Sequence, residues 1–231
     1  MESSLDWMNR IKPDKARALM LAKREVSVLV YDAVQLEGIP FTLPEIQTLL
    51  EGVTVGGHKI SDQQVALNQN KAWQHLFKAV NENSFEFSQS FVCSLHAIAG
   101  KEEALEWGQF RTGMVSIAGT DYMPPRATEL ESEFEILRNE LGGIADIYDR
   151  AIHAFLRMAR AQFFYDVNKR MGRFMMNGIL LSHGYPAINL PFKKKLQFNE
   201  LMLPFYESGD ERPMNQFMRS CVQEKTIQLM E

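Results

Sequence analysis

The feature that most constrains the fold is a pair of apolar segments, residues 144–161 and 174–181, separated by a short polar one. In both segments apolar residues recur at the three- and four-residue spacing of a helix face, and the first is the strongest such pattern in the chain. Because a helix of this character must bury its surface, we expect residues 144–161 to run through the centre of the protein. The polar segment 162–173 then joins two core helices.

Most of the remaining sequence also predicts helices. Helical spacing runs through residues 13–36, and Thr42 followed by Glu45 is typical of the N-cap of a helix over residues 42–50. Residues 112–126 break this rhythm with a short β-type run and a turn sequence, which predict a short β-hairpin. The expected fold class is therefore mostly α with one hairpin. The other expected helices are residues 62–80, 88–100, 129–141, 194–208 and 213–229.

Composition limits the classes of protein that this chain can represent. With 231 residues, 45% of them hydrophobic, we expect one domain over residues 1–231. A net charge of −4 gives no general attraction for nucleic acid. The first residues lack the apolar run of a signal peptide, and no segment approaches the roughly 20 apolar residues of a membrane span. We therefore expect a cytoplasmic protein that binds neither nucleic acid nor a membrane.

The polar segment carries the candidate chemistry. At a helix start, free backbone N–H groups and the positive end of the helix dipole favour an anion, and Gly172 would let a backbone approach a phosphate closely. Arg170 and Arg173 share a helix face and could bind successive phosphates, while Asp166 could hold a bridging Mg²⁺. An alternative is a capped helix start with structural salt bridges, and composition alone favours neither. The crowded residues are Asp166, Asn168, Lys169, Arg170 and Arg173.

This segment resembles the motif of the Fic (Fic/Doc) family, H-x-F-x-[D/E]-G-N-[G/K]-R-x-x-R. Flanking sequences extend the similarity over about residues 31–217: LHAIAG before GQFR, then VSIAGTDYMPP, then GILLSHGYPAINLP before ESGDERP. Residues 1–60 resemble the inhibitory-helix region of self-inhibited members, and residues 61–231 resemble the family's core. The resemblance implies a mostly helical Fic-type domain that transfers AMP from ATP to a hydroxyl of a target protein. The matching positions are Phe164, Asp166, Asn168, Lys169, Arg170 and Arg173.

The resemblance also implies a role for each residue. Asp166 would be the Mg²⁺ ligand, and Asn168 with the surrounding backbone would hold the α-phosphate of ATP. Arg170 and Arg173 would hold the terminal phosphates. A flap would pair edgewise with the backbone of an unidentified target protein and present a hydroxyl to the site. The implied nucleotide-binding set is Asn168, Lys169, Arg170, Gly172 and Arg173, and the flap is Val115, Ser116, Ile117, Ala118 and Gly119.

Two positions depart from the family pattern and one leaves the chemistry open. Gln162 stands where the motif has the histidine that acts as general base. An amide cannot accept a proton near neutral pH, and loss of a positioned base typically lowers a rate by on the order of 10²–10⁴-fold. Val167 replaces the usual glycine, which restricts how the loop wraps phosphates. Lys169 lies within the pattern, but one member with lysine there transfers phosphate instead of AMP.

An inhibitory helix is the second part of the resemblance. Its pattern is [S/T]-x-x-x-E-[G/N], and this chain keeps Glu37 and Gly38 but has Ala33 at the Ser/Thr position. The resemblance implies that Glu37 pairs with Arg173 and occupies the site of the γ-phosphate. An alternative is that Glu37 is a solvated residue at a helix end before a C′ glycine.

Three hypotheses follow. The first is a Fic-fold protein that binds ATP and Mg²⁺ but is impaired in adenylylation by Gln162. The second is an active transferase of AMP or another phosphate-containing group that uses a non-standard base. The third is a non-enzymatic interaction or regulatory protein with a vestigial anion site. His96 and His153 are more typical of packed structural residues than of a rescuing base, and no histidine spacing indicates a zinc site.

Overall fold

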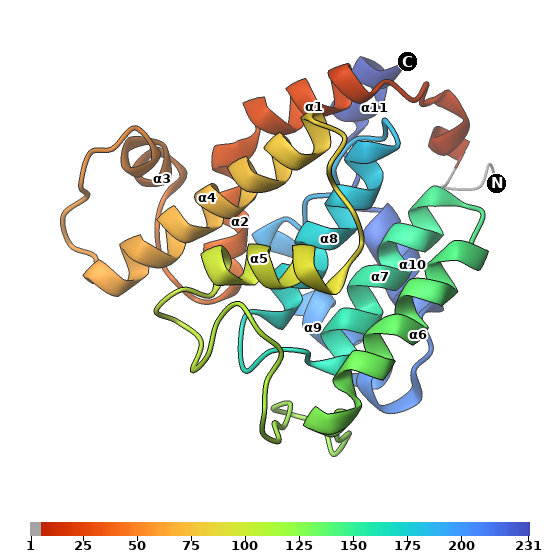
Figure 1. The fold of residues 1–231 in the computed structure, drawn as a ribbon. Coiled ribbons are helices and arrows are strands. Elements are labelled where there is room, and N and C mark those ends of the chain that lie inside the picture. The colour runs from red at the N-terminus through yellow and green to blue at the C-terminus, as the bar shows by residue number, and fades with distance from the viewer. Residues whose placement is uncertain (1–5) are drawn as a thin grey trace.

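Helices α7 (Ile147–Ala161) and α8 (Asn168–Ser182) pack against each other at the centre of the structure, a computed structural model that describes residues 6–231. Nearly every residue of α8 is buried, including its polar start. Figure 1 shows the other helices arranged around this pair. The expected central helix is therefore present, and the fold is helical as expected. None of the helices within residues 6–231 combines the length and apolar character that crossing a membrane requires.

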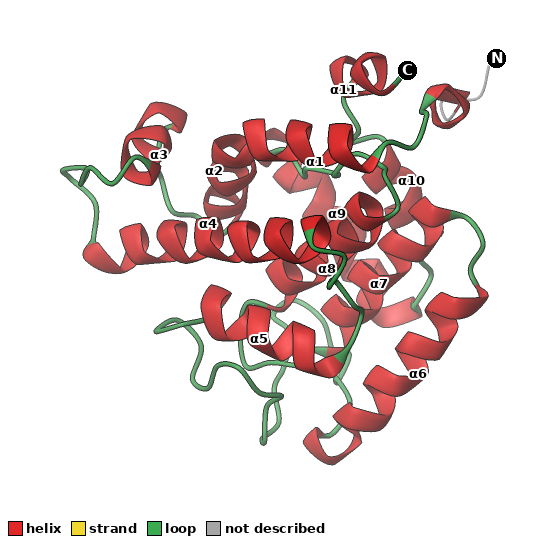
Figure 2. Cartoon of the chain, turned by 45° about the horizontal axis from the view of Figure 1, so that its top comes forward, coloured by secondary structure: helices red, strands yellow, loops and turns green. Residues whose placement is uncertain are grey.

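The other helices follow one another along the chain with short connections, except for the long loop between α5 and α6 (Figure 2). They are η1 (Asp6–Arg10), α1 (Lys15–Arg24), α2 (Val26–Leu36), α3 (Leu43–Leu50), α4 (Ile60–Asn81), α5 (Gln89–Ala99), η2 (Ala127–Glu129), α6 (Leu130–Gly143), η3 (Phe192–Lys194), α9 (Lys195–Ser208), α10 (Arg212–Arg219) and α11 (Glu224–Met230).

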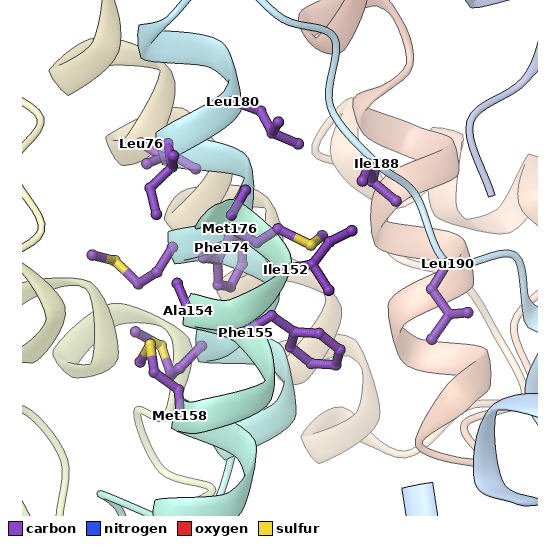
Figure 3. Close-up of a cluster of buried hydrophobic side chains, with 14 of the residues drawn as sticks. Leu76, Ile152, Ala154, Phe155, Met158, Phe174, Met176, Leu180, Ile188 and Leu190 are labelled. Atoms are coloured by element: carbon purple, nitrogen blue, oxygen red, sulfur yellow. The ribbon is translucent and has the colours of Figure 1, made fainter. Parts of the chain in front are cut away.

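The hydrophobic core forms one cluster that joins elements distant in the sequence. Figure 3 shows part of it, where Leu76 of α4 lies near the paired helices that carry Ile152, Phe155 and Phe174. These side chains are all at most 2% exposed. Their burial removes apolar surface from water, which is the main favourable contribution to folding. The start of α8, and with it the polar segment, is therefore carried on the buried centre of the protein.

Two long helices expected from the sequence are each divided in the structure. The pattern over residues 13–36 breaks at Glu25, which ends α1 and begins α2, so that both helices can pack against α4. The pattern over residues 213–229 breaks after α10, where the ammonium group of Lys194 donates to the carbonyl of Ser220 at 2.9 Å. In each case the apolar spacing continues across a break that tertiary packing stabilises.

The expected β-hairpin over residues 112–126 is not present. No strand is assigned within residues 6–231, and this segment is a loop (Figure 2). Its polar groups bond to another element instead of to each other: the hydroxyl of Thr120 and the N–H of Asp121 both donate to Glu207 of α9, the latter at 2.9 Å. The two consecutive prolines near its end have no N–H for a β-ladder. These contacts replace the cross-strand hydrogen bonds that the sequence pattern suggested.

Gly172 allows the two central helices to approach closely. A Cβ at this position would lie 2.8 Å from the ring and 2.9 Å from the carbonyl oxygen of Phe155 on α7. Gly172 therefore faces the helix interface, which corrects the expectation that it opens the backbone to a phosphate. We expect Gly172→Ala to lower the free energy of unfolding by about 1–3 kcal/mol, because the added methyl group overpacks a backbone contact.

Gly142 provides the matched control for this prediction. It lies in α6, and a Cβ there would meet nothing within 4 Å. Gly142→Ala should therefore be neutral or stabilising by up to about 1 kcal/mol through helix propensity. Urea unfolding of both variants checks the prediction, and equal effects would show that Gly172 is not a packing requirement.

Candidate functional site

The segment that joins α7 to α8 begins and ends with residues in the left-handed conformation. Gln162 caps α7 with φ 51°, and Val167 caps the start of α8 with φ 66°. This conformation is costly for a β-branched side chain. The resembled motif has a glycine at this position, and glycine adopts the left-handed conformation readily. Val167 adopts the same conformation at a cost in strain.

A cleft of about 500 Å³ lies over this loop. Four separate parts of the chain line it: the residue after α2, the loop between α5 and α6, the α7–α8 loop and one side of α9. The predicted flap and most of the predicted motif therefore meet in one place. The lining residues are Glu37, Ser116, Ile117, Ala118, Gly119, Gln162, Tyr165, Asp166, Val167, Asn168, Lys169, Phe198, Asn199, Met202, Leu203 and Tyr206.

Gln162 and Asn168 hold the loop in shape. The amide nitrogen of Gln162 donates to the carbonyl of Ala159 at 2.6 Å, and its amide oxygen accepts from Asn168 at 3.0 Å. The Asn168 amide also donates to the carbonyl of Phe164 at 2.7 Å and accepts from the N–H of Phe164 at 2.9 Å. Since both ends of each amide are used within the loop, Asn168 shapes the backbone that a phosphate would meet, and its side chain is not free to bind one.

Asp166 is an exposed carboxylate on the cleft wall. One of its oxygens accepts from the N–H of Val167 at 2.6 Å, which leaves the other oxygen available. Within residues 6–231 no group of three or more His, Cys, Asp or Glu side chains could hold a metal ion. Mg²⁺ in nucleotide sites is commonly bound by one or two carboxylates, with phosphates and water completing its octahedron. A lone Asp166 therefore fits Mg²⁺ delivered with a nucleotide and does not fit a resident metal.

The two motif arginines do not line the cleft. Arg170 donates through both terminal nitrogens to the carboxylate of Glu103, one of them at 2.9 Å, and its Nε lies 3.5 Å from Glu37. Arg173 is 8% exposed and has no ion pair within residues 6–231. The expected pairing of Glu37 with Arg173 is thus corrected: Glu37 contacts Arg170. Glu37 lines the cleft, whereas neither arginine does.

Lys169 is the cation that does face the cleft. Burial lowers the pKa of its ammonium group, an effect that the negative charge of Glu37 partly opposes. The lowered pKa makes the neutral amine more accessible than for a lysine in water.

Three residues that support the loop were not identified as functional from the sequence. Arg111 donates to the carbonyls of Gln162 (2.6 Å) and Gly113 (2.7 Å), and it also reaches that of Pro125. It therefore joins both ends of the 112–126 loop to the motif. No sequence signal revealed this, because a buried arginine bonded to carbonyls needs no carboxylate partner at a recognisable spacing. Glu103, the partner of Arg170, lies in the same connection after α5.

His96 is the third support. The N–H of Gly108 donates to its Nδ1 at 3.1 Å, so Nε2 carries the proton and lies 3.3 Å from the carbonyl of Asp166. The ring stacks on Phe164, and burial lowers its pKa to about 4, so it is neutral. This agrees with the expected structural role, since His96 does not line the cleft.

His153 is also structural, as expected, and lies between two carboxylates: Nδ1 is 2.8 Å from Glu211 and Nε2 is 3.1 Å from Glu140. Burial acts to lower its pKa, but these two partners outweigh burial and raise it. A raised folded-state pKa adds stability that is fully present below the unfolded value of about 6.5 and is lost as pH rises through the folded value. We expect the melting temperature of the protein to fall relative to that of His153→Gln as pH rises through this range. Parallel melting curves across pH would contradict this.

Residues 86–180 match the model of the Fic/DOC family. The chain is related to Fic adenylyltransferases. It is 27% identical over 236 residues to protein adenylyltransferase Fic of Drosophila persimilis, covering 99% of this chain and 45% of that protein. It is 28% identical over 219 residues to the protein of the same name from Drosophila grimshawi, covering 92% of this chain and 44% of that one. The chain thus spans less than half the length of these relatives.

Solved structures share the fold. Fic-1 (residues 134–508) from C. elegans superposes with a TM-score of 0.78 at 19% identity, covering 99% of this chain and 66% of that one. A Fic domain containing signaling protein from Bacteroides thetaiotaomicron superposes with a TM-score of 0.75 at 18% identity, covering 97% of this chain and 92% of the other.

Proposed function

We propose that this chain binds ATP with Mg²⁺ in the cleft, that Glu37 holds it in a self-inhibited state, and that Gln162 impairs transfer of AMP to a target hydroxyl. The observation that carries the proposal is the meeting of Asp166, Lys169 and Glu37 with the flap in one cleft. A carboxylate suited to Mg²⁺, a cation and the start of a helix together favour a nucleotide's phosphates.

The opposite wall of the cleft suits the base of a nucleotide. Phe198, Met202 and Tyr206 of α9 line it, and all three are nearly buried. The flat base would bury its apolar surface against this wall, while the phosphates would face the polar loop. This division of the cleft into an apolar and a polar side supports a nucleotide over a simple inorganic anion.

Self-inhibition is supported by the position of Glu37. Its carboxylate is 3.5 Å from Arg170, and Glu37 lines the cleft whereas neither arginine does. To reach those arginines, the terminal phosphates of ATP must displace the Glu37 carboxylate. If the carboxylate stays in place, its negative charge repels the phosphates. ATP affinity is therefore set by competition with Glu37.

The flap supports an unidentified target protein as partner. Within residues 6–231, the backbone N–H groups of residues 114–119 donate no hydrogen bond, so they are available to pair edgewise with an extended chain. Such pairing binds a target by its main chain.

Impaired transfer is supported by the environment of Gln162. Its amide donates to the carbonyl of Ala159 in α7 and accepts from Asn168, and it has no basic nitrogen to take a proton from a hydroxyl. The second candidate, an active transferase with a non-standard base, is favoured by Lys169, which faces the cleft with a lowered pKa.

Calorimetric titration with ATP and Mg²⁺ tests the proposal. We expect Glu37→Gly to bind ATP at least about tenfold more tightly than the unchanged protein, because a competing carboxylate is removed. Adding Arg173→Ala to that variant should weaken binding again.

Glu51→Gly is the matched control. Glu51 ends α3 and precedes a glycine, as Glu37 ends α2 and precedes one, but it does not line the cleft. It should leave ATP affinity unchanged. If neither the unchanged protein nor Glu37→Gly binds ATP, the proposal fails, and the result supports the hypothesis of a non-enzymatic interaction protein.

A further inference from the structure

A small cavity of about 20 Å³ lies beside the two motif arginines, bounded by α2, α4, α8 and the segment that follows α8. Ile188 and Leu190 of that segment and Phe174 of α8 are visible in Figure 3. The cavity shares no lining residue with the cleft. Its lining residues are Leu29, Ala33, Leu36, Gln69, Trp73, Arg170, Arg173, Phe174, Asn177, Ile188, Asn189 and Leu190.

Three buried nitrogens of residues that line this cavity have no hydrogen-bond partner within residues 6–231: Nε2 of Gln69, Nε of Arg170 and Nη2 of Arg173. Nε of Arg170 lies 3.5 Å from the carboxylate of Glu37, which leaves Gln69 and Arg173 as the two residues with a wholly unpaired donor. Gln69 is 1% exposed and Arg173 is 8% exposed, so bulk water does not satisfy these donors either. Buried donors left unpaired cost free energy, which makes two of them beside one cavity unusual.

The charge balance of the two arginines differs. Arg170 is neutralised by the carboxylates of Glu103 and Glu37. Arg173 has no such contact within residues 6–231, and the nearby carboxylate of Asp32 already accepts from Asn189 and from the N–H of Phe192. Burial lowers the pKa of Arg173 to about 10, yet a guanidinium group stays protonated at neutral pH. The cavity therefore adjoins a buried positive charge without a contacting counter-ion.

We propose that this cavity is a binding site for a single monovalent halide ion, such as chloride, held by Arg173 and Gln69. The ligand must accept hydrogen bonds without needing acceptors in return, which matches a set of unpaired donors. It must be a single small ion, because a volume of about 20 Å³ is little more than one water molecule needs, and this excludes phosphate, sulfate and carboxylates.

The bound halide would stabilise the arrangement of α2 on α8. Leu29, Ala33 and Leu36 of α2 form one side of the cavity, and Arg173 of α8 forms another. An anion between them neutralises Arg173 and so favours the docked position of α2. Glu37 follows α2 directly, so the halide would favour the position of Glu37 as well. The site is defined without a nucleotide and does not rest on the proposed function.

The first test is crystallographic. Crystals of the unchanged protein, free of nucleotide, are grown or soaked in sodium bromide, and anomalous diffraction is measured at the bromine edge. We expect one anomalous peak in the cavity within hydrogen-bond distance of Arg173 and Gln69. A map without a peak there would mean that the cavity holds water only, and the proposal would be overturned.

The second test is thermal unfolding in sodium chloride against sodium gluconate at equal ionic strength. At a chloride concentration of about ten times its dissociation constant, binding should raise the melting temperature by roughly 3–6 °C. Gln69→Leu removes one donor and should weaken the halide response at least tenfold. Gln74→Leu, on the exposed side of the same helix, should keep the full response. Identical melting temperatures in both salts would overturn the proposal, and if Gln69→Leu does not fold, the anomalous map decides alone.

Discussion

The double variant Gln162→His, Glu37→Gly is expected to transfer AMP from ATP to itself or to added protein at a rate on the order of 10²–10⁴-fold above that of Glu37→Gly alone. The gain comes from supplying a positioned base to an otherwise assembled cleft. The left-handed backbone at this position is one that histidine tolerates better than most residues do. The carbonyl of Ala159, which now accepts from Gln162 at 2.6 Å, is placed to orient an imidazole ring through one nitrogen and leave the other free.

Labelled ATP and autoradiography measure this transfer. Gln162→Leu combined with Glu37→Gly is the matched control, because it changes the same side chain without adding a base, and it should show no gain. If the histidine variant binds ATP but transfers nothing, the missing base is not what impairs the site, and strain at Val167 becomes the leading explanation. If the parent Glu37→Gly already transfers a phosphate-containing group, the non-standard base is supported, and Lys169→Met should abolish that activity.

Glu103→Ala is expected to destabilise the protein by about 3–5 kcal/mol, the second large effect. Arg170 is buried, with its side chain 2% exposed, and the Glu103 carboxylate binds both of its terminal nitrogens. Without Glu103, Arg170 keeps only the more distant carboxylate of Glu37, and a poorly compensated buried charge is far costlier than the net contribution of the pair itself. For a chain of this size the melting temperature should fall by on the order of 10 °C.

Glu102→Ala is the control for this prediction, since Glu102 is the exposed neighbour in the same loop. It should change stability by no more than about 0.5 kcal/mol. Glu103→Gln keeps the shape of the side chain and its hydrogen bonding but removes the charge. Its loss of stability should therefore lie between those of Glu103→Ala and Glu102→Ala. A loss below about 1 kcal/mol for Glu103→Ala would mean that Arg170 finds another partner, with Glu37 the nearest candidate.

Much of the candidate site could be predicted from the sequence because its signal is local. The spacing of Asp166, Asn168 and Lys169 within one loop, between two strongly apolar helices, places them together at the start of a helix. Resemblance added two distant segments, the flap and Glu37, and both meet the loop in the cleft. The residues that hold the loop were not predictable in the same way, since Arg111 acts through carbonyl groups that every residue possesses.

What the sequence by itself determined is the helical character of the chain, its central helix pair and the polar loop between them, because apolar periodicity and turn residues act over a few neighbouring positions. Only the tertiary structure decided where the helices divide, that Gly172 serves packing, and that residues 112–126 bond to α9 instead of forming a hairpin. It also decided that Arg170 faces Glu103 rather than the cleft. A buried charge takes whichever partner the folded chain brings within reach, and that partner can lie far away in the sequence.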